Sequence, residues 1–427
     1  MKLLLHSLRN IIHSRHFGTQ LKISGSKSET NRLLLLQALY PNIILENTSN
    51  SDDSEVMIKV LQSKDEVIDI HHAGTAMRFL TAYFSIQENR EVVLTGSSRM
   101  KERPIKILVD ALHQLGADIS YEENEGFPPI RIKGKKLTAN KVNLNANVSS
   151  QYISALLLIA SKLENGLELT LEGEITSVPY IQMTLSLLNE LEIETSFEGN
   201  IIRVNPKSQI PSRSVGTKSQ IIESDWSSAS YFYSIIALSE IGTQITLSSY
   251  KENSLQGDSV LVEIYKDFGV ETIFRKNEIT IKKSHPEASG LNPKSHPEAS
   301  GLNLKSSPDI AQTIAVTCFG LGIGCNLTGL HTLKIKETDR LEALKNELTK
   351  LGATVSVTND SLILEKSSKI NENISVKTYQ DHRMAMAFAP LALKVPIIIE
   401  EAGVVSKSYP SFWEDLKTIG FKIESIK

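Results

Sequence analysis

The chain repeats one order of hydrophobic and polar positions. Apolar residues first recur at the three- and four-residue spacing of an amphipathic helix, then a glycine or a short polar break follows, and then a β-rich run. The pattern predicts a mixed α/β protein with many short elements. Copies of the pattern lie at residues 56–70, 107–120, 185–197, 261–274, 344–357 and 412–425.

The breaks and the spacing of these copies add detail. Gly116, Gly269, Gly352 and Gly420 stand where a helix end favours a left-handed residue before the chain reverses into a strand. Six copies in 427 residues have a mean period of about 71, which fits a βαβαββ-sized unit better than a thin solenoid repeat. Because helix, glycine and strand follow one another in many α/β proteins, the repeat alone leaves chance similarity open.

Composition narrows the class of protein. The 427 residues include 46 Lys and Arg against 49 Asp and Glu, and the net charge is −3. With 41% hydrophobic and 22% charged residues, this is the composition of an ordinary globular protein, and the length suggests about two or three domains. The near-neutral balance argues against a nucleic-acid or membrane-surface binder. No apolar run approaches the roughly 18 residues of a membrane-spanning helix.

The N-terminus and the cysteines favour a cytoplasmic protein. Residues 1–28 contain Lys and Arg but no acid, as transit peptides do, yet the apolar run at 3–5 is too short for a signal-peptide core. Cys318 and Cys325 lie in a glycine-rich apolar stretch and offer neither a disulfide framework nor a zinc ligand set. We therefore expect two buried thiols in a reducing compartment.

One segment occurs twice in tandem, as SHPEASGLNPK at 284–294 and SHPEASGLNLK at 295–305. Its Pro, Gly, Ser and Asn content and its lack of hydrophobic periodicity predict an exposed loop insertion over 284–305. The repeated His-Pro-Glu permits a metal site, but a duplication in a tolerant loop explains the sequence more simply. We expect deletion of 295–305 to leave activity intact.

Seven predicted helix starts carry polar or basic residues. A helix N-terminus presents free N–H groups and the positive end of the helix dipole, so it favours an anion. The set fits a ligand with several phosphates or carboxylates, although each start taken alone also fits an ordinary capped helix. The starts lie at 26–29, where Ser-x-x-Glu forms a capping box, and at 73–78, 148–151, 177–180, 307–309, 336–340 and 380–383; further basic residues lie at 99–103 and at Lys407.

Acid–base candidates lie among these starts. Asp309 and Glu337 each stand beside helix-start cations or donors, and Lys27 offers a cationic proton carrier. His382 fits an orienting role as well as proton transfer. The chain contains no nucleophile elbow, His-Glu-x-x-His, Walker loop or dinucleotide-binding glycine fingerprint, which disfavours metal- and nucleotide-dependent mechanisms.

Five of these motifs together resemble those of the 5-enolpyruvylshikimate-3-phosphate synthase (3-phosphoshikimate 1-carboxyvinyltransferase) family. They occur in that family's order, and the resemblance extends over residues 24–410. The motifs are Gly-Ser-Lys-Ser at 25–28 with Asn-Arg at 31–32, Ala-Gly-Thr-Ala-Met-Arg at 73–78, Arg-Met-Lys-Glu-Arg-Pro at 99–104, Lys-Glu-Thr-Asp-Arg-Leu at 336–341 and Asp-His-Arg-Met-Ala-Met at 381–386.

The resemblance implies a fold of the α/β (α+β) class. This fold is a two-domain inside-out α/β barrel built from six βαβαββ repeats, three per domain, with helix N-termini facing a cleft. The chain would cross between the domains near 24–26 and 223–226, so that 1–24 and 225–427 form one domain and 25–224 the other. The charged residues expected to meet in the cleft are Lys27, Arg32, Arg78, Arg103, Lys336, Arg340, Arg383 and Lys407.

The implied reaction transfers the enolpyruvyl group of phosphoenolpyruvate to the 5-hydroxyl of shikimate 3-phosphate and releases phosphate, in the shikimate route to chorismate and the aromatic amino acids. Asp309 would accept the hydroxyl proton. Glu337 with Lys27 would protonate and later deprotonate the methylene carbon around a tetrahedral intermediate. The resemblance implies no cofactor and no metal, a monomer, and no partner beyond the two substrates.

The resemblance also assigns substrate contacts, residue by residue. Shikimate 3-phosphate would be held by Lys27, Ser28, Arg32, Ser149, Ser150, Gln151, Ser177, Tyr180, Asp309 and Lys336. Phosphoenolpyruvate would be held by Lys27, Gly74, Arg103, Gln151, Arg340, Arg383 and Lys407. The chain departs from the family pattern at His72, Phe79 and Thr332, so we expect different packing behind the phosphoenolpyruvate residues and one altered contact to shikimate 3-phosphate.

Two other functions remain open at this point. The related enolpyruvyl transferase that acts on UDP-N-acetylglucosamine shares the implied fold, but it usually carries a reactive Cys in the domain that corresponds to residues 25–224, where this chain has none. A non-enzymatic repeat protein that binds polyanions is the second alternative. It would have no need for carboxylates such as Asp309, Glu337 and Asp381 beside its cations.

Overall fold

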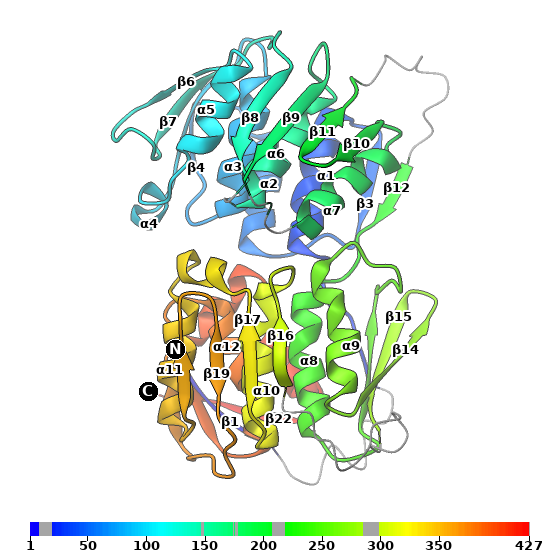
Figure 1. Ribbon diagram of the computed structural model, residues 1–427, viewed down its shortest axis with the longest axis vertical. Coiled ribbons are helices and arrows are strands. Elements are labelled where there is room, and N and C mark those ends of the chain that lie inside the picture. Colours follow the sequence, from blue (N-terminus) through cyan, green and yellow to red (C-terminus); the bar gives the residue numbers. More distant parts are fainter. Residues whose placement is uncertain are drawn as a thin grey trace. The chain divides into compact units, whose positions relative to one another are not determined.

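The computed structural model describes residues 1–7, 19–146, 149–173, 175, 178–206, 218–284 and 299–426 (Figure 1). By their internal contacts the residues form two compact units. Unit 1 comprises Met1–Gly25 and Glu223–Lys427, and unit 2 comprises Ser26–Ile222. The chain therefore starts and ends in unit 1, and unit 2 is inserted between these two parts.

Unit 2 alternates helices with short strands. Its helices are α1 (Lys27–Leu39), α2 (Asp52–Gln62), α3 (Gly74–Ser85), α4 (Ser98–Lys101), α5 (Lys106–Gln114), α6 (Ser150–Ala160) and α7 (Val178–Glu190). Its strands are β3 (Ile43–Glu46), β4 (Val67–Asp69), β5 (Glu91–Thr95), β6 (Asp118–Tyr121), β7 (Ile130–Lys133), β8 (Lys141–Asn145), β9 (Leu167–Glu172), β10 (Thr195–Glu198), β11 (Ile201–Val204) and β12 (Lys218–Ile221).

Unit 1 alternates in the same way. Its α-helices are α8 (Trp226–Leu238), α9 (Leu261–Lys266), α10 (Ala311–Leu321), α11 (Arg340–Lys350), α12 (His382–Phe388) and α13 (Phe412–Thr418), and its 3₁₀ turns include η1 (Gly257–Val260), η3 (Pro308–Ile310), η4 (His331–Ile335), η5 (Ala389–Leu393) and η6 (Ala402–Lys407). Its strands are β1 (Lys2–Ser7), β2 (Gln20–Leu21), β13 (Gln244–Ser248), β14 (Val270–Arg275), β15 (Glu278–Lys283), β16 (Ala299–Asn303), β17 (Cys325–Thr328), β18 (Val355–Val357), β19 (Leu362–Leu364), β20 (Ile374–Val376), β21 (Ile397–Ile399) and β22 (Phe421–Ile426).

The four-stranded sheets share one strand order. In unit 2, β4 pairs in parallel with β5, β5 pairs antiparallel with β7, and β7 pairs antiparallel with β6. Within the described residues the sheets β8-β9-β11-β10, β2-β13-β15-β14 and β16-β17-β19-β18 repeat this order, and so does β20-β21-β1-β22, in which the first strand of the chain takes the third place. A sixth, two-stranded sheet pairs β12 with β3 in parallel.

Helices that are apolar on all sides form the centre of each unit. In unit 1, α8 and α10 pack against each other and bury nearly every side chain (Figure 1). In unit 2, α3 and α6 do the same. A helix with no polar face is stable only when neighbours cover it on every side. Polar residues inside these helices bond to one another, as Ser234 of α8 and Thr317 of α10 do, and the predicted residues Gly74, Ser150 and Gln151 lie at the starts of α3 and α6.

The structure confirms the predicted mixed α/β class. Gly116, Gly269, Gly352 and Gly420 have φ angles of 92°, 73°, 103° and 101°, the left-handed region that the helix-to-strand reversals require. Both cysteines are free and buried, as expected. No helix in the described part of the chain combines the length and the apolar character needed to cross a bilayer.

The duplicated segment differs from its prediction. Residues 285–298 lie outside the described residues, but Ala299–Asn303 form strand β16, which pairs in parallel with β17. Leu304 follows this strand, is 2% exposed, and donates its backbone N–H to the carbonyl of Thr328 at 2.9 Å. The end of the second copy is thus part of a sheet and of the core, because β17 offers it an open edge that the local sequence does not reveal.

Candidate functional site

In unit 2, Arg32 lies almost fully buried on α1 and is surrounded by neutral oxygens. Its Nε donates to the hydroxyl of Thr184 at 2.8 Å, and its Nη2 donates to the hydroxyl of Ser154 at 2.8 Å. The carbonyls of Ser28 and Tyr180 accept from Nη1 and Nη2 at 2.7 and 3.4 Å. We call these five residues the Arg32 cluster. Burial lowers the pKa of Arg32 to about 10, although Tyr180 and Glu29 act in the opposite direction.

The start of α1 carries the next predicted residues. Lys27 is the first residue of the helix, and its Nζ lies 3.9 Å from Oδ2 of Asp53. The predicted capping box does not form, because the side chain of Ser26 makes no cap hydrogen bond. Gly25 forms a bridge with Ser224 directly before the helix, so this strand-like pairing fixes how the chain enters α1.

The starts of α3 and α6 lie close together. The Nε2 of Gln151 donates to the hydroxyl of Thr75 at 3.2 Å, and Ser149 caps α6 by accepting from the N–H of Gln151. At Gly74 a Cβ atom would lie 2.5 Å from Nη1 of Arg103, so the Arg103 guanidinium rests against the backbone of Gly74. Two residues predicted to hold phosphoenolpyruvate are therefore in contact.

Arg78 has a structural role. It is 4% exposed, donates from Nη1 to the carbonyl of Gly74 at 3.0 Å, and donates from Nη2 to the carbonyl of Pro104 at 3.2 Å. These contacts join α3 to the segment after Arg103, and the expected place of Arg78 among the charges of a cleft stays a prediction. Phe79 is fully buried, with its ring 5.5 Å from Cζ of Arg32.

Three further residues of unit 2 were predicted to hold shikimate 3-phosphate: Ser150, Tyr180 and Ser177. Ser150 is buried in the first turn of α6. The Tyr180 ring lies 5.8 Å from Cζ of Arg32. Ser177 lies outside the described residues.

In unit 1, Arg340 at the start of α11 is surrounded by carboxylates. Its Nη1 lies 2.9 Å from Oδ1 of Asp309, its Nη2 lies 2.7 Å from Oε2 of Glu337, and its Nε lies 2.6 Å from Oδ2 of Asp381. Arg340 is 1% exposed. Burial lowers its pKa, but Asp381, Glu337 and Asp309 together outweigh burial and raise the pKa above its usual value.

Asp309 joins three cations. Besides its ion pair with Arg340, it lies 3.5 Å from Nζ of Lys336 and 3.1 Å from Nη2 of Arg383. Burial lowers the pKa of Arg383, but Asp309 and other neighbours raise it well above its usual range. We call Asp309, Lys336, Glu337, Arg340, Asp381 and Arg383 the Arg340 cluster. The cluster places both predicted acid–base carboxylates on one arginine.

Helix caps hold the cluster in place. Asp339 caps α11 by accepting from the N–H groups of Leu341 and Glu342. Asp381 caps α12 by accepting from the N–H of Arg383 while it also binds Arg340. Burial raises the pKa of Asp381, and Arg340 opposes this shift.

Lys407 and His382 lie beside the cluster. The Nζ of Lys407 donates to the carbonyl of Gln380 at 2.8 Å, next to Asp381 in the chain. His382 is 2% exposed, and its Nδ1 lies 3.8 Å from Oδ1 of Asp381. This burial favours the orienting role that the sequence left open. Thr332, the third departure from the family pattern, lies in η4.

Two residues that the sequence reasoning missed adjoin Arg383. Ser227, in the first turn of α8, has its hydroxyl 3.3 Å from Nη2 of Arg383. The same hydroxyl makes a short hydrogen bond to Asp258, which is 6% exposed. The sequence Gln-Gly-Asp at 256–258 gives no periodic or charge signal, so only the pairing of distant segments reveals this contact.

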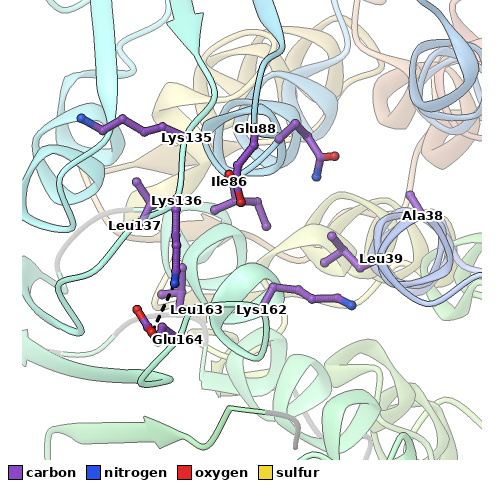
Figure 2. Close-up of a pocket in the computed structure, with 11 residues that line it drawn as sticks. Ala38, Leu39, Ile86, Glu88, Lys135, Lys136, Leu137, Lys162, Leu163 and Glu164 are labelled. Atoms are coloured by element: carbon purple, nitrogen blue, oxygen red, sulfur yellow. Dashed lines mark ion pairs between the residues drawn. The ribbon is translucent and has the colours of Figure 1, made fainter. Parts of the chain in front are cut away.

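A cavity of about 440 Å³ in unit 2 lies away from these residues. It is lined by the ends of α1, α3 and α6, the helices whose starts carry the predicted residues (Figure 2). Figure 2 shows apolar side chains such as Leu39 and Leu163 with Lys135, Lys136 and Lys162, and Lys136 forms an ion pair with Glu164. Lys162 follows the C-terminus of α6, where a cation offsets the negative end of the helix dipole. Lys135 donates its backbone N–H to Ser85 at the end of α3, and Lys136 is paired with Glu164, so these lysines are accounted for without a ligand.

The described residues contain no group of three or more His, Cys, Asp or Glu side chains suited to a metal ion. The polar groups that converge are instead the cations and hydroxyls of the Arg32 cluster and the cations and carboxylates of the Arg340 cluster. Positive groups at helix starts favour phosphates and carboxylates, and carboxylates beside them are suited to proton transfer.

Comparisons with known proteins agree with these features. The EPSP synthase (3-phosphoshikimate 1-carboxyvinyltransferase) family model matches residues 54–416. The 3-phosphoshikimate 1-carboxyvinyltransferase of Bacteroides fragilis is 45% identical, covering 95% of this chain and 96% of the relative, and that of Haemophilus influenzae is 32% identical, covering 94% and 96%. The solved EPSP synthase from Acinetobacter baumannii has the same fold, with a TM-score of 0.77 over 100% of both chains at 21% identity. The chain therefore belongs to the EPSP synthase family, the 3-phosphoshikimate 1-carboxyvinyltransferases.

Proposed function

We propose that this protein transfers the enolpyruvyl group of phosphoenolpyruvate to the 5-hydroxyl of shikimate 3-phosphate, a step toward chorismate and the aromatic amino acids. Family membership supports this reaction over the two alternatives. The observation that carries the proposal is the placement of Asp309, an aspartate within 3.5 Å of Lys336, Arg340 and Arg383. A carboxylate among cations can take a proton next to a bound anion.

The proposed chemistry is an addition followed by an elimination. In the addition, the 5-hydroxyl oxygen bonds to C2 of phosphoenolpyruvate while its proton passes to Asp309, and C3 gains a proton from Glu337 with Lys27. In the elimination, the C2–O bond to phosphate breaks, C3 returns its proton to Glu337 with Lys27, and the proton held by Asp309 leaves with the phosphate. The net products are 5-enolpyruvylshikimate 3-phosphate and inorganic phosphate.

In unit 2 the proposed role of the Arg32 cluster is to hold shikimate 3-phosphate. The helix starts at Ser28 and Ser150 supply N–H groups, and Arg32 supplies a positive charge that its neutral partners leave uncompensated. Gln151 connects this group to α3, where Gly74 and Arg103 would hold phosphoenolpyruvate. The further contacts proposed for shikimate 3-phosphate are Lys27, Ser149, Ser177 and Tyr180.

In unit 1 the proposed role of the Arg340 cluster is to hold phosphoenolpyruvate and to move protons. Arg340, Arg383 and Lys407 would neutralise its phosphate and carboxylate, and Lys336 with Asp309 would contact shikimate 3-phosphate. Preorganised cations of this kind stabilise the charge of the tetrahedral intermediate without reorganising during the step. The proposed reaction uses residues of this chain alone, and we propose a monomer without a cofactor.

We also propose that the six sheets correspond to six βαβαββ units, three in unit 1 and three in unit 2, arranged as the inside-out barrel of the family. The common strand order of the four-stranded sheets supports this interpretation. The boundaries of units 1 and 2 lie within two residues of the expected crossings at 24–25 and 224–225, which supports treating them as the two domains.

Phosphate release tests the proposed reaction. Purified full-length protein should release inorganic phosphate from phosphoenolpyruvate when shikimate 3-phosphate is present, without added metal and not with either substrate alone. Product formation should be followed in parallel by mass spectrometry. Release with UDP-N-acetylglucosamine in place of shikimate 3-phosphate would assign the chain to the other enolpyruvyl transferase, and no release with either acceptor would refute the proposal.

A further inference from the structure

Residues 254–258 connect the start of α8 to the Arg340 cluster. The amide of Gln256 accepts from the N–H of Trp226 at 3.0 Å and donates to the carbonyl of Ser224 at 2.9 Å. On the other side, the hydroxyl of Ser307 donates to the carbonyl of Gly257 at 2.8 Å. Ser307 lies directly before η3, which carries Asp309. The two residues that precede Asp258 are thus tied, through the Gln256 side chain and the Gly257 carbonyl, to segments that carry Ser227 and Asp309.

Within this frame, three side chains form a chain of hydrogen bonds. The Ser227 hydroxyl donates its one proton to Oδ2 of Asp258. Its oxygen therefore has lone pairs free to accept, and Nη2 of Arg383 donates to it at 3.3 Å. The same Nη2 also lies 3.1 Å from Oδ2 of Asp309, and Nη1 of Arg383 donates to the carbonyl of Asp309 at 3.2 Å. Two edges of the Arg383 guanidinium are held in this way.

The charged groups around Asp258 include Arg383 and its partner Asp309. The groups that act on it are Asp309 from η3, Arg383 from α12 and Asp225, the cap of α8, together with the Ser227 hydroxyl. Burial raises the pKa of Asp258 to about 7; Asp309 adds to the shift, and Arg383 opposes it. Asp258 in turn is among the groups that keep Arg383 charged. In the described part of the chain, Arg383 forms an ion pair with Asp309, whereas Asp258 is connected to Arg383 through the Ser227 hydroxyl.

We propose that Asp258 is a positioning residue for phosphoenolpyruvate: through the Ser227 hydroxyl it holds the Arg383 guanidinium in the orientation that binds this substrate's anionic groups. The inference rests on the proposed function. A guanidinium is planar and binds anions through pairs of parallel N–H groups, so a rotation of its plane weakens binding even when its charge is kept. Ser227 and the Asp309 carbonyl bind two different nitrogens of that plane, Nη2 and Nη1.

Substitutions of the middle residue test the chain of contacts. Ser227→Ala in the full-length protein should raise the KM for phosphoenolpyruvate about 10-fold, because one hydrogen bond to a charged group is lost. The KM for shikimate 3-phosphate should stay within about 2-fold, since no residue of the Arg32 cluster is touched. Ser227→Thr keeps the hydroxyl and should restore the KM for phosphoenolpyruvate, whereas a residue that merely fills space would gain nothing from the hydroxyl.

A double substitution tests whether Asp258 acts through Ser227. Asp258→Ala should raise the KM for phosphoenolpyruvate about 10-fold, and adding Ser227→Ala should raise it no further, whereas independent effects would multiply to about 100-fold. Asp267→Asn, at an exposed aspartate that ends α9, serves as the matched control and should leave both KM values unchanged. Melting temperatures of all variants identify any that fail to fold.

Several results would overturn the inference. These are a parallel rise in both KM values, no rescue by Ser227→Thr, or multiplicative effects of the two substitutions. If the unmodified protein shows no turnover, the proposed function fails, and the inference is then judged by calorimetry with phosphoenolpyruvate alone. Equal affinity of the unmodified protein and Ser227→Ala would refute it, and about 10-fold weaker binding by the variant would support it.

Discussion

Arg32 in unit 2 and Arg340 in unit 1 are both almost fully buried, but their surroundings are opposite. Arg32 donates to hydroxyl and carbonyl oxygens, and burial lowers its pKa to about 10. Arg340 donates to three carboxylates, which raise its pKa despite burial. Neutral oxygens fix an arginine without cancelling its charge, whereas carboxylates do both.

The difference separates two tasks. Within the Arg32 cluster the hydrogen-bond partners are neutral groups, and burial outweighs the effect of Glu29 on the pKa of Arg32, which suits the cluster to attract and hold a phosphate. In the Arg340 cluster much of the positive charge is already balanced, and its carboxylates are the groups that can accept and return protons. The Arg32 cluster is thus suited to binding, and the Arg340 cluster combines binding with acid–base chemistry. The predictions below test this division.

Replacing Asp309 should have the largest effect. Asp309→Asn keeps the size of the side chain but removes the proton acceptor, so kcat should fall about 1000-fold, within the range of general-base catalysis. The KM values should change much less, since Lys336, Arg340 and Arg383 remain. Steady-state kinetics at saturating concentrations of both substrates measure this. A loss confined to KM would show that the Arg340 cluster only binds.

Removing each buried arginine should affect stability differently. Arg340→Met leaves Asp381 buried without its charged partner and should lower the free energy of unfolding by about 3 kcal/mol. Arg32→Met leaves only neutral acceptors unpaired and should cost about 1 kcal/mol. Melting temperatures at pH 7 compare the two variants. Equal losses would contradict the contrast between the two clusters.

Deletions in the duplicated segment test whether β16 and Leu304, which precede Asp309 in the chain, contribute to stability. Deleting 284–294 keeps Leu304, and we expect stability and activity to be unchanged. Deleting 295–305 leaves a chain that differs only in having Pro293 where Leu304 stood. The proline removes a buried side chain and the N–H that Thr328 accepts, so we expect a loss of about 2 kcal/mol, in place of the neutral deletion expected from sequence. Thermal unfolding distinguishes the two deletions.

A substitution at Gly74 tests whether unit 2 also binds phosphoenolpyruvate. Gly74→Ala places a Cβ 2.5 Å from Nη1 of Arg103, so the guanidinium must move. We expect the KM for phosphoenolpyruvate to rise about 10-fold and stability to change little, since the clash is with the end of a flexible side chain. An unchanged KM would remove Arg103 from the proposed site.

The smallest effect should be a pH dependence at Asp258. Its pKa is about 7 in the folded protein, against an ordinary value of 3.8. Between these values the folded state holds a proton that the unfolded state has released, so raising the pH through this window favours unfolding. Asp258→Asn cannot titrate. Its melting temperature, relative to that of the unmodified protein, should therefore increase between pH 5 and pH 8; a constant difference would contradict the shift.

The sequence predicted features that depend on local order. Helix starts place Gln151 and Gly74 correctly, because each lies within one turn of its helix terminus, and the chain reversals follow from glycines such as Gly116. Prediction from the sequence failed where the local structure depends on a segment far away in the chain. The Ser26 side chain makes no cap hydrogen bond, and the preceding residue, Gly25, is bridged to the distant Ser224. Residues 299–303 form a strand because β17 pairs with them.

The same limit explains why two residues beside the Arg340 cluster were missed. Ser227 and Asp258 are 31 positions apart, and neither stands out in its own neighbourhood. Their hydrogen bond exists only because residues 254–258 pack on the start of α8. Periodicity and motif spacing carry no information about such a contact, whereas the carboxylates Asp309 and Glu337 were visible as charges beside helix starts.

The position of β1 has a consequence for how the chain folds during synthesis. Residues 2–7 lie between β21 and β22, and Leu3 pairs with Ile399 on one side and Ser425 on the other. Strand β1 is therefore synthesised long before its partners β21 and β22, while the contiguous stretch Ser26–Ile222 can fold as soon as it emerges from the ribosome. We expect nascent chains to fold unit 2 first and to keep Leu3 and Leu5 accessible to chaperones until β21 and β22 have emerged.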